Sequence, residues 1–197
     1  MKWLSILVVS LLLFTSCIKK ADRLSKNTKP QDDEAFMQNI YLQAQGAAKE
    51  KNHLRSIYLH EKNCALGYAP SCNRLAYRYY KGDIIKTNHT KAQILYHRAC
   101  SQLGDHLACF NEANMLRSNH KDYHSARISY DAMCNAGHHN SCYNLAVMYY
   151  KGQGVKKRNK KKAAKIIKQA CHNGYNRACK IVGKMKKGKI TYLPNAQ

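Results

Sequence analysis

Acidic side chains are scarce in this chain of 197 residues, which has 11 Asp and Glu against 34 Lys and Arg and a formal net charge of +23. Asp131 is the last acidic residue, so residues 132–197 add only basic charge. The densest basic patch comprises Lys156, Lys157, Arg158, Lys160, Lys161, Lys162 and Lys165. Charge patterns bear on association rather than on fold. This one indicates an anionic partner surface, the alternative being helix faces that are simply solvated.

Metal-binding motifs are also missing. The nine cysteines include no C-x-x-C pair, and the ten histidines include neither H-x-H nor H-E-x-x-H, which are spacings typical of metal sites. His138 and His139 are adjacent, and neighbouring side chains on a turn point apart more often than they converge. We therefore expect no metal site and no cofactor.

No apolar run is long enough to span a membrane. Residues 4–14 provide about 11 apolar positions, whereas a spanning helix needs roughly 20. The run follows Lys2 and ends in Thr15, Ser16 and Cys17, which resembles a bacterial lipoprotein signal. That resemblance implies export, with Cys17 lipidated as the mature N-terminus of a membrane-anchored protein facing the periplasm or the cell surface. Ordinary cleavage near Ser16 is the alternative.

Eight cysteines remain after Cys17, and they fall into four local pairs. Three pairs span eight positions and one spans nine, and their first members follow at 36, 34 and 37 residues. The pairs are Cys64/Cys72, Cys100/Cys109, Cys134/Cys142 and Cys171/Cys179. In an exported chain, disulfides are favoured over zinc ligation. A fixed period of this length predicts a solenoid of stacked units.

Each unit is predicted to be a helix, a turn and a second helix. The eighth and fourth positions before the first cysteine define the buried stripe of the first helix. They are Ser56, Ala92, Ala126 and Ala163, and His60, Tyr96, Tyr130 and Ile167. A glycine three or four residues after that cysteine can end the helix in the left-handed conformation. The extra residue of the second unit, near Leu103, is expected in this turn.

The second cysteine of each pair opens the second helix, so the bridge would clamp a helical hairpin. Small and apolar residues follow it at the third and fourth positions, and tyrosine pairs then lead to a glycine. These residues are Leu75, Ala76, Leu145, Ala146, Val182 and Gly183, then Tyr79, Tyr80, Tyr149 and Tyr150, with Gly82 and Gly152. Tyrosines at such recurring offsets favour packing between repeats over a binding stripe.

These elements divide the chain into four parts. The expected parts are a signal (1–17), a flexible tether (18–34), a solenoid (35–190) and a C-terminal tail (189–197). Within the solenoid we expect a capping helix at 35–51 and repeats at about 52–88, 89–122, 123–159 and 160–188. A lone helix at the start is expected because solenoids need atypical ends that cover their core.

The pattern A-x3-Y-x3-C-x2-G-x4-C-x2-L-A-x2-Y-Y-x-G over residues 126–152 resembles the Sel-one-like repeat. Its paired cysteines are similar to those of the Helicobacter cysteine-rich proteins. The resemblance covers residues 52–188 and implies an all-α, right-handed α/α superhelical solenoid that serves as a scaffold for protein or peptide contacts. The second unit departs from the pattern at Glu112–Ala113 and lacks the closing glycine. The fourth lacks the tyrosine pair and looks like a terminal cap.

An enzyme is the alternative function, because some cysteine-rich relatives are described as binding or hydrolysing penicillins. S-x-x-K occurs twice, at Ser16–Lys19 across the cleavage site and at Ser118–Lys121 in an expected loop, without S-D-N or K-T-G companions. Export argues against nucleic-acid binding by the basic patch. The sequence therefore favours an exported, lipid-anchored scaffold for a protein or peptide partner of acidic character, with anionic lipid or cell-wall polymer as further partners.

Overall fold

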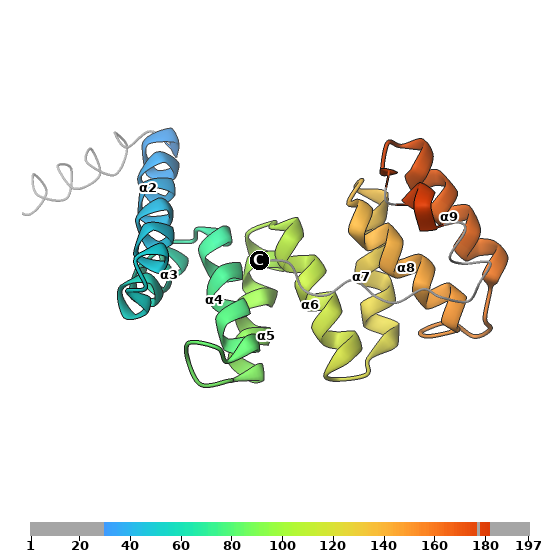
Figure 1. The fold of residues 1–197 in the computed structure, drawn as a ribbon, viewed down its shortest axis with the longest axis horizontal. Helices are drawn as coiled ribbons and strands as arrows, with labels where there is room; N and C mark the ends of the chain where they lie inside the picture. The colour runs from blue at the N-terminus through green and yellow to red at the C-terminus, as the bar shows by residue number, and fades with distance from the viewer. Residues whose placement is uncertain (1–29, 177, 182–197) are drawn as a thin grey trace, which may run out of the picture.

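The computed structural model describes residues 30–176 and 178–181, and every regular element among them is helical. The helices are α2 (Pro30–Lys49), α3 (His53–Ala65), α4 (Ala69–Lys81), α5 (His89–His97), the π-helical turn η1 (Arg98–Gln102), α6 (His106–Ser118), α7 (Tyr123–Asn135), α8 (His139–Lys151) and α9 (Lys160–His172). Successive helices pack on one another along the long axis of the molecule (Figure 1). This arrangement is the expected all-α solenoid.

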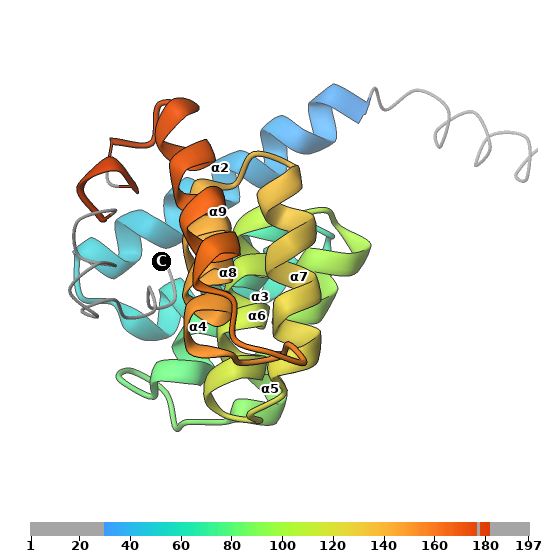
Figure 2. The ribbon, with the colours of Figure 1, turned by 90° about the vertical axis from the view of Figure 1, so that its right-hand side faces the viewer.

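Viewed from its α9 end, the solenoid presents helices that lie one behind another (Figure 2). None of the helices in the described part of the chain is long and apolar enough to cross a membrane. The expected signal and Cys17, the tail at 189–197, and Val182 and Gly183 lie outside the described residues.

The first helices of the hairpins share an N-terminal cap that the sequence-based expectation did not include. Asn52, Asn88, Asp122 and Asn159 each accept a hydrogen bond from the backbone N–H three residues on. All four residues stand twelve positions before the first cysteine of their unit. A side-chain oxygen at this position satisfies a backbone donor that the helix leaves unpaired, so each repeat fixes the start of its own helix.

The predicted stripe is buried throughout α3, α5, α7 and α9. Its small members and its large members all have exposed fractions below 9%. The second helices bury Leu75, Ala76, Leu145 and Ala146 against them. Since the small residues let neighbouring helices approach closely and the large ones fill the space between units, the core runs along the whole solenoid.

The four cysteine pairs are disulfides across the turns between first and second helices. Their Cα–Cα distances are 4.7 Å for Cys64–Cys72, 4.6 Å for Cys100–Cys109, 4.5 Å for Cys134–Cys142 and 4.9 Å for Cys171–Cys179. The glycine between each pair has a positive φ, for example +97° at Gly67. The turn therefore folds each chain segment back so that the two cysteines face one another.

The extra residue of the second unit lies in the helix and not in the turn as expected. Arg98–Gln102 forms a π-helical turn that includes Cys100, and Leu103 caps it. A π turn accommodates one additional residue within a helix. The disulfide keeps its place because the insertion is absorbed before the chain turns at Gly104.

The N-terminal boundary also differs from the expectation. α2 begins at Pro30, so residues 30–34 are helical and the tether expected at 18–34 does not reach residue 34. Proline suits the first turn of a helix because its fixed φ matches and its missing N–H has no partner there. The helix continues through Gly46 to Lys49, burying Ile40, Ala44 and Ala47, whereas Phe36 is 57% exposed.

Candidate binding surface

Ion pairs within the described residues are confined to the first half of the solenoid. They are Arg78–Asp83 at 3.3 Å, Lys91–Glu61 at 3.9 Å and His97–Glu112 at 2.9 Å. None of these three involves α7, α8 or α9, although α9 and the loop before it hold the basic patch. The seven cations of the basic patch therefore form no ion pair within the described residues.

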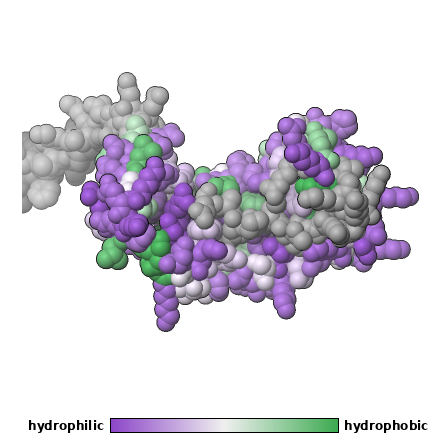
Figure 3. All heavy atoms as spheres, viewed as in Figure 1, coloured by the Kyte–Doolittle hydropathy of each residue, from purple (hydrophilic) through white to green (hydrophobic). Residues whose placement is uncertain are grey.

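The basic patch lies at the start of α9 and in the loop before it. Lys156, Lys157 and Arg158 are in the loop, Lys160–Lys162 form the first turn of α9, and Lys165 follows one turn later. All seven side chains are exposed. Figure 3 shows mostly hydrophilic side chains at the α9 end of this face, whereas apolar ones gather at the α2–α3 end.

The tyrosine pair at the end of α8 packs in the core and also contacts the basic patch. Tyr149 is buried and Tyr150 packs against the same core cluster. The Lys162 ammonium lies 4.3 Å from the centre of the Tyr149 ring, and Lys160 and Arg158 lie 5.6 Å and 5.3 Å from that of Tyr150. Cation–π attraction thus holds three cations over the end of α8, a role that packing alone did not predict.

The loop between α8 and α9 is fixed on both sides. The Arg158 Nε–H donates to the Tyr150 carbonyl at 2.7 Å, and the Arg127 Nε–H of α7 donates to the Gly154 carbonyl at 2.9 Å. Gly154 has a φ of +69°, and a Cβ there would overlap the Tyr123 carbonyl oxygen. Only glycine fits this approach of the loop to α7, so Lys156 and Arg127 are held on the same side of α8.

Two hollows lie beside α8, one bounded by α7, α8 and α9 and the other by α7, α8 and the loop between α8 and α9. The first has a volume of 530 Å³ and is lined on its polar side by Asp131, His139, Lys162, Lys165 and His172, and on its apolar side by Cys142, Leu145, Ile166 and Ala170. The second has a volume of 610 Å³ and is lined by His124, Arg127, Tyr149, Gly154, Val155 and Lys156. Both volumes are in the range of ligand sites. Asp131 is the single acidic residue in either lining.

The Sel1 repeat model matches the chain at residues 40–68, 69–102 and 139–175, just over half of its length. The chain belongs to the Sel1 repeat family. Each of the four disulfides crosses the boundary of a matched Sel1 repeat, for example Cys64–Cys72 at 68/69 and Cys134–Cys142 before 139. In this frame Cys64–Cys72 joins two successive matched repeats, and each of the other three bridges joins a matched repeat to the residues beside it.

Solved structures with the Sel1 repeat fold are similar to this chain. A Sel1 repeat protein from Oxalobacter formigenes is 20% identical to this chain, with a TM-score of 0.66. The match covers 94% of this chain and 79% of the Oxalobacter chain. The protein c5321, a protective antigen of uropathogenic Escherichia coli strains, has 19% identity and a TM-score of 0.58, covering 66% of this chain and 28% of its own. At these identities the similarity shows the fold alone.

Helicobacter pylori cysteine rich protein B has 19% identity and a TM-score of 0.30, covering 79% of this chain and 98% of its own. No curated protein sequence matches the chain. The chain spans about a quarter of the length of c5321, so nothing about that whole protein's activity follows for this one.

The Sel1 match leaves out residues 103–138, which include the second helix of the unit that departs from the pattern. Glu112 stands where Leu75 and Leu145 stand in the matched repeats. Its carboxylate accepts from or pairs with His97 Nδ1 at 2.9 Å, and its side chain is only 13% exposed. The Glu112 carboxylate thus occupies the position of a core leucine and still has a polar partner, because α5 supplies His97.

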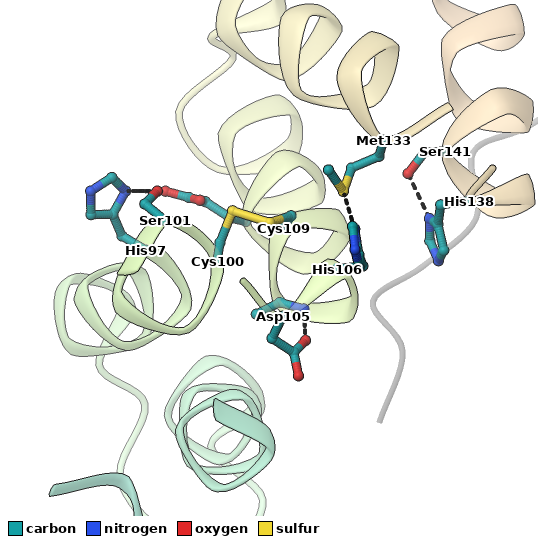
Figure 4. The surroundings of a disulfide bond; sticks show 11 residues. His97, Cys100, Ser101, Asp105, His106, Cys109, Met133, His138 and Ser141 are labelled. Carbon is teal, nitrogen blue, oxygen red and sulfur yellow. Dashed lines mark hydrogen bonds and ion pairs between the residues drawn. A yellow bond between two sulfur atoms is a disulfide. The ribbon is translucent and has the colours of Figure 1, made fainter. Parts of the chain in front are cut away.

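His97 does not form a catalytic triad with its neighbours. Ser101 Oγ lies 3.4 Å from His97 Nδ1, the same ring nitrogen that faces Glu112 (Figure 4). A serine triad needs the serine and the acid on opposite ring nitrogens. The arrangement therefore has no base positioned to take a proton from Ser101.

The adjacent histidines His138 and His139 point to different partners. The His138 ring contacts Ser141 Oγ at 2.7 Å (Figure 4) and meets Phe110 edge-on, and burial lowers its pKa. The His139 ring stacks on Tyr175 with centroids 5.1 Å apart. In the described part of the Sel1 solenoid no three His, Cys, Asp or Glu side chains gather as a metal site requires.

The S-x-x-K match is placed differently from the expectation. Ser118 is the last residue of α6 and not a loop residue, and its hydroxyl donates to the Asn114 carbonyl at 2.8 Å. Lys121 lies in the following loop with a φ of +54°. The serine hydroxyl is thus engaged by the backbone of its own helix, as serines near helix ends often are.

Buried asparagines link the second helices of successive Sel1 repeats. Asn111 Nδ2–H donates to Asn73 Oδ1, and Asn144 Nδ2–H to Asn114 Oδ1, both at 2.9 Å. The Tyr130 hydroxyl also donates to Asn114 Oδ1, and burial raises the pKa of Tyr130 to about 12. Sequence reasoning missed this ladder, although asparagine recurs one or two positions after the second cysteine at 73, 111 and 144.

Proposed function

We propose that this protein is an exported, lipid-anchored Sel1 repeat scaffold that binds acidic protein or peptide partners at the bacterial envelope. Sel1 repeat proteins in general are scaffolds for protein interaction. The observation that carries the acidic preference is the distribution of ion pairs, since the three that the described residues form lie before α7 while the basic patch lies after it. The signal-like start ending in Cys17 and the four disulfides support export, because disulfides persist in oxidising compartments.

The proposed mechanism is mechanical and electrostatic. Disulfides across each repeat boundary hold the surface in one shape, so that the scaffold loses little conformational entropy when a partner binds. The exposed cations of the patch attract acidic partners and raise the rate of encounter. Attraction between exposed charges is screened by salt over about 10 Å at 0.1 M, so the interaction should depend on ionic strength.

In-cell photo-crosslinking from the patch, followed by identification of the captured molecule, tests this function. A photoreactive residue replaces Lys157, which is exposed and lines neither hollow. We expect an envelope protein with an acidic segment, whose affinity for the purified scaffold falls at least tenfold between 50 mM and about 500 mM salt. Binding that is unchanged by salt, or capture of lipid or wall polymer alone, would contradict the proposal.

A further inference from the structure

The hollow between α7 and α9 and the hollow between α7 and the α8–α9 loop are joined by one residue pair. Lys162 lines the first hollow, Tyr149 lines the second, and the lysine lies over the tyrosine ring. Helices α7 and α9 both pack on α8 between them. The hollows are therefore consecutive parts of one groove along α8, whose 13 residues span about 20 Å.

We propose that this groove binds an extended acidic peptide in which acidic and apolar residues alternate. The inference rests on the proposed function and names its site. At about 3.3 Å per residue, a groove of this length takes about six residues of extended chain. Successive side chains of such a chain point in opposite directions, so one set can face the cations while the other faces the apolar lining.

The charges of the groove fit carboxylates. Lys162 and Lys165 line the first hollow and Arg127 and Lys156 the second. None of these four forms an ion pair within the described residues. Asp131 alone opposes them, so the groove keeps a positive excess that an acidic ligand would neutralise.

The apolar lining favours a peptide over a phosphate polymer. Leu145, Ile166 and Ala170 line the first hollow, and Tyr149 and Val155 the second. These side chains pack in the core and only part of each faces the hollows. A phosphate polymer would leave that part in contact with water, whereas apolar side chains of a peptide would cover it at about 25 cal/mol per Å². The combination of cations and apolar surface selects a ligand that carries both kinds of group.

An earlier repeat shows the same contact already satisfied within the chain. Lys91 occupies in α5 the position of Lys162 in α9, three residues after the capping asparagine, and lies 4.3 Å from the Tyr79 ring centre. There Glu61 completes the contact at 3.9 Å from Lys91 Nζ. Asp131 is the counterpart of Glu61 but is one methylene shorter and makes no ion pair with Lys162. A carboxylate supplied by a ligand would take that place.

The test compares the two lysines in the purified mature protein. Two fluorescein-labelled eight-residue peptides serve as probes, one alternating glutamate with leucine and the other glutamate with serine. Fluorescence anisotropy at 50 mM salt gives their affinities for the unmodified protein, Lys162→Gln and the matched control Lys91→Gln. The two variants are matched because each loses one lysine–tyrosine contact. Unfolding midpoints equal to that of the unmodified protein show that both variants keep the fold.

We expect the glutamate–leucine peptide to bind at least threefold more tightly than the glutamate–serine peptide. Lys162→Gln should weaken its binding about fivefold, in the range of one exposed charge pair, and Lys91→Gln less than twofold. Equal losses in both variants, equal affinities for both peptides, or no binding of either would overturn the groove assignment. If both peptides bind equally and inorganic polyphosphate displaces them completely, the site is assigned to phosphate polymers instead.

The outcomes separate this inference from the function on which it rests. A partner captured in cells whose binding is salt-sensitive but unchanged by Lys162→Gln leaves the scaffold function standing and refutes the groove. Peptide binding as expected, without a salt-sensitive partner in cells, refutes the proposed function and leaves the groove.

Discussion

His60 lies on the buried stripe of α3, at the position that Tyr96 and Tyr130 hold in the following repeats. It is 3% exposed, its Nδ1 contacts Ser71 Oγ at 3.2 Å, and its ring meets that of Tyr41 edge-on at 5.5 Å. Burial lowers the pKa of His60 from 6.5 to about 4, helped by the positive charge of Arg74 and Arg78. The histidine is thus neutral in the folded protein and charged when unfolded at mildly acidic pH.

The sign of the effect on stability follows from proton binding. Below pH 6.5 the unfolded chain binds a proton at His60 that the folded chain does not, so the free energy of unfolding falls as the pH falls. The loss begins near pH 6.5 and is complete near pH 4. With these two pKa values, the unfolding free energy drops by about 2.5 kcal/mol between pH 7.5 and 4.5 through this one group.

Urea unfolding followed by circular dichroism at pH 7.5, 6.5, 5.5 and 4.5 measures this loss. The variant His60→Phe places a ring of similar shape on the stripe and removes the titration, and His53→Gln changes an exposed histidine of the same helix. We expect the first variant to lose most of the pH dependence over this window and the second to keep it. Loss of the Ser71 contact lowers the free energy of unfolding by the same amount at every pH. The test is therefore the slope of the unfolding free energy against pH, not its absolute value. A slope in His60→Phe as steep as in the unmodified protein would refute the argument.

Three further predictions concern the cysteines. Mass spectrometry of unreduced peptides should find bridges 64–72, 100–109, 134–142 and 171–179, and free thiols or long-range pairing would contradict the repeat model. Replacing Cys134 and Cys142 by serine should lower the unfolding free energy by about 2.5 kcal/mol, since the bridge closes a short loop of the unfolded chain; an unchanged urea midpoint would contradict this. Cys17→Ser should abolish incorporation of labelled palmitate and move the protein from the membrane to the soluble fraction, and unchanged labelling would refute lipidation.

The repeat architecture was predictable because its signals are local. Three signals act within one hairpin: the cysteine period, the turn glycines and the buried stripe that includes Tyr96 and Ile167. Spacing along the chain is therefore enough to place them. The boundaries were less predictable. A proline can begin a helix as well as interrupt one, which misplaced the start of α2, and the π turn at Arg98–Gln102 depends on what the helix end packs against.

The sequence by itself determined the all-α solenoid, the cysteine partners and the basic character of the C-terminal half. Only the tertiary structure decided which cations are paired. Lys91 and Lys162 have equivalent places in their repeats and equivalent tyrosines, and both face an acidic residue three positions before a cysteine. The glutamate reaches its lysine and the shorter aspartate does not form the pair. Whether two charges meet depends on the distance between neighbouring helices compared with the length of a side chain, and spacing along the chain does not contain that distance.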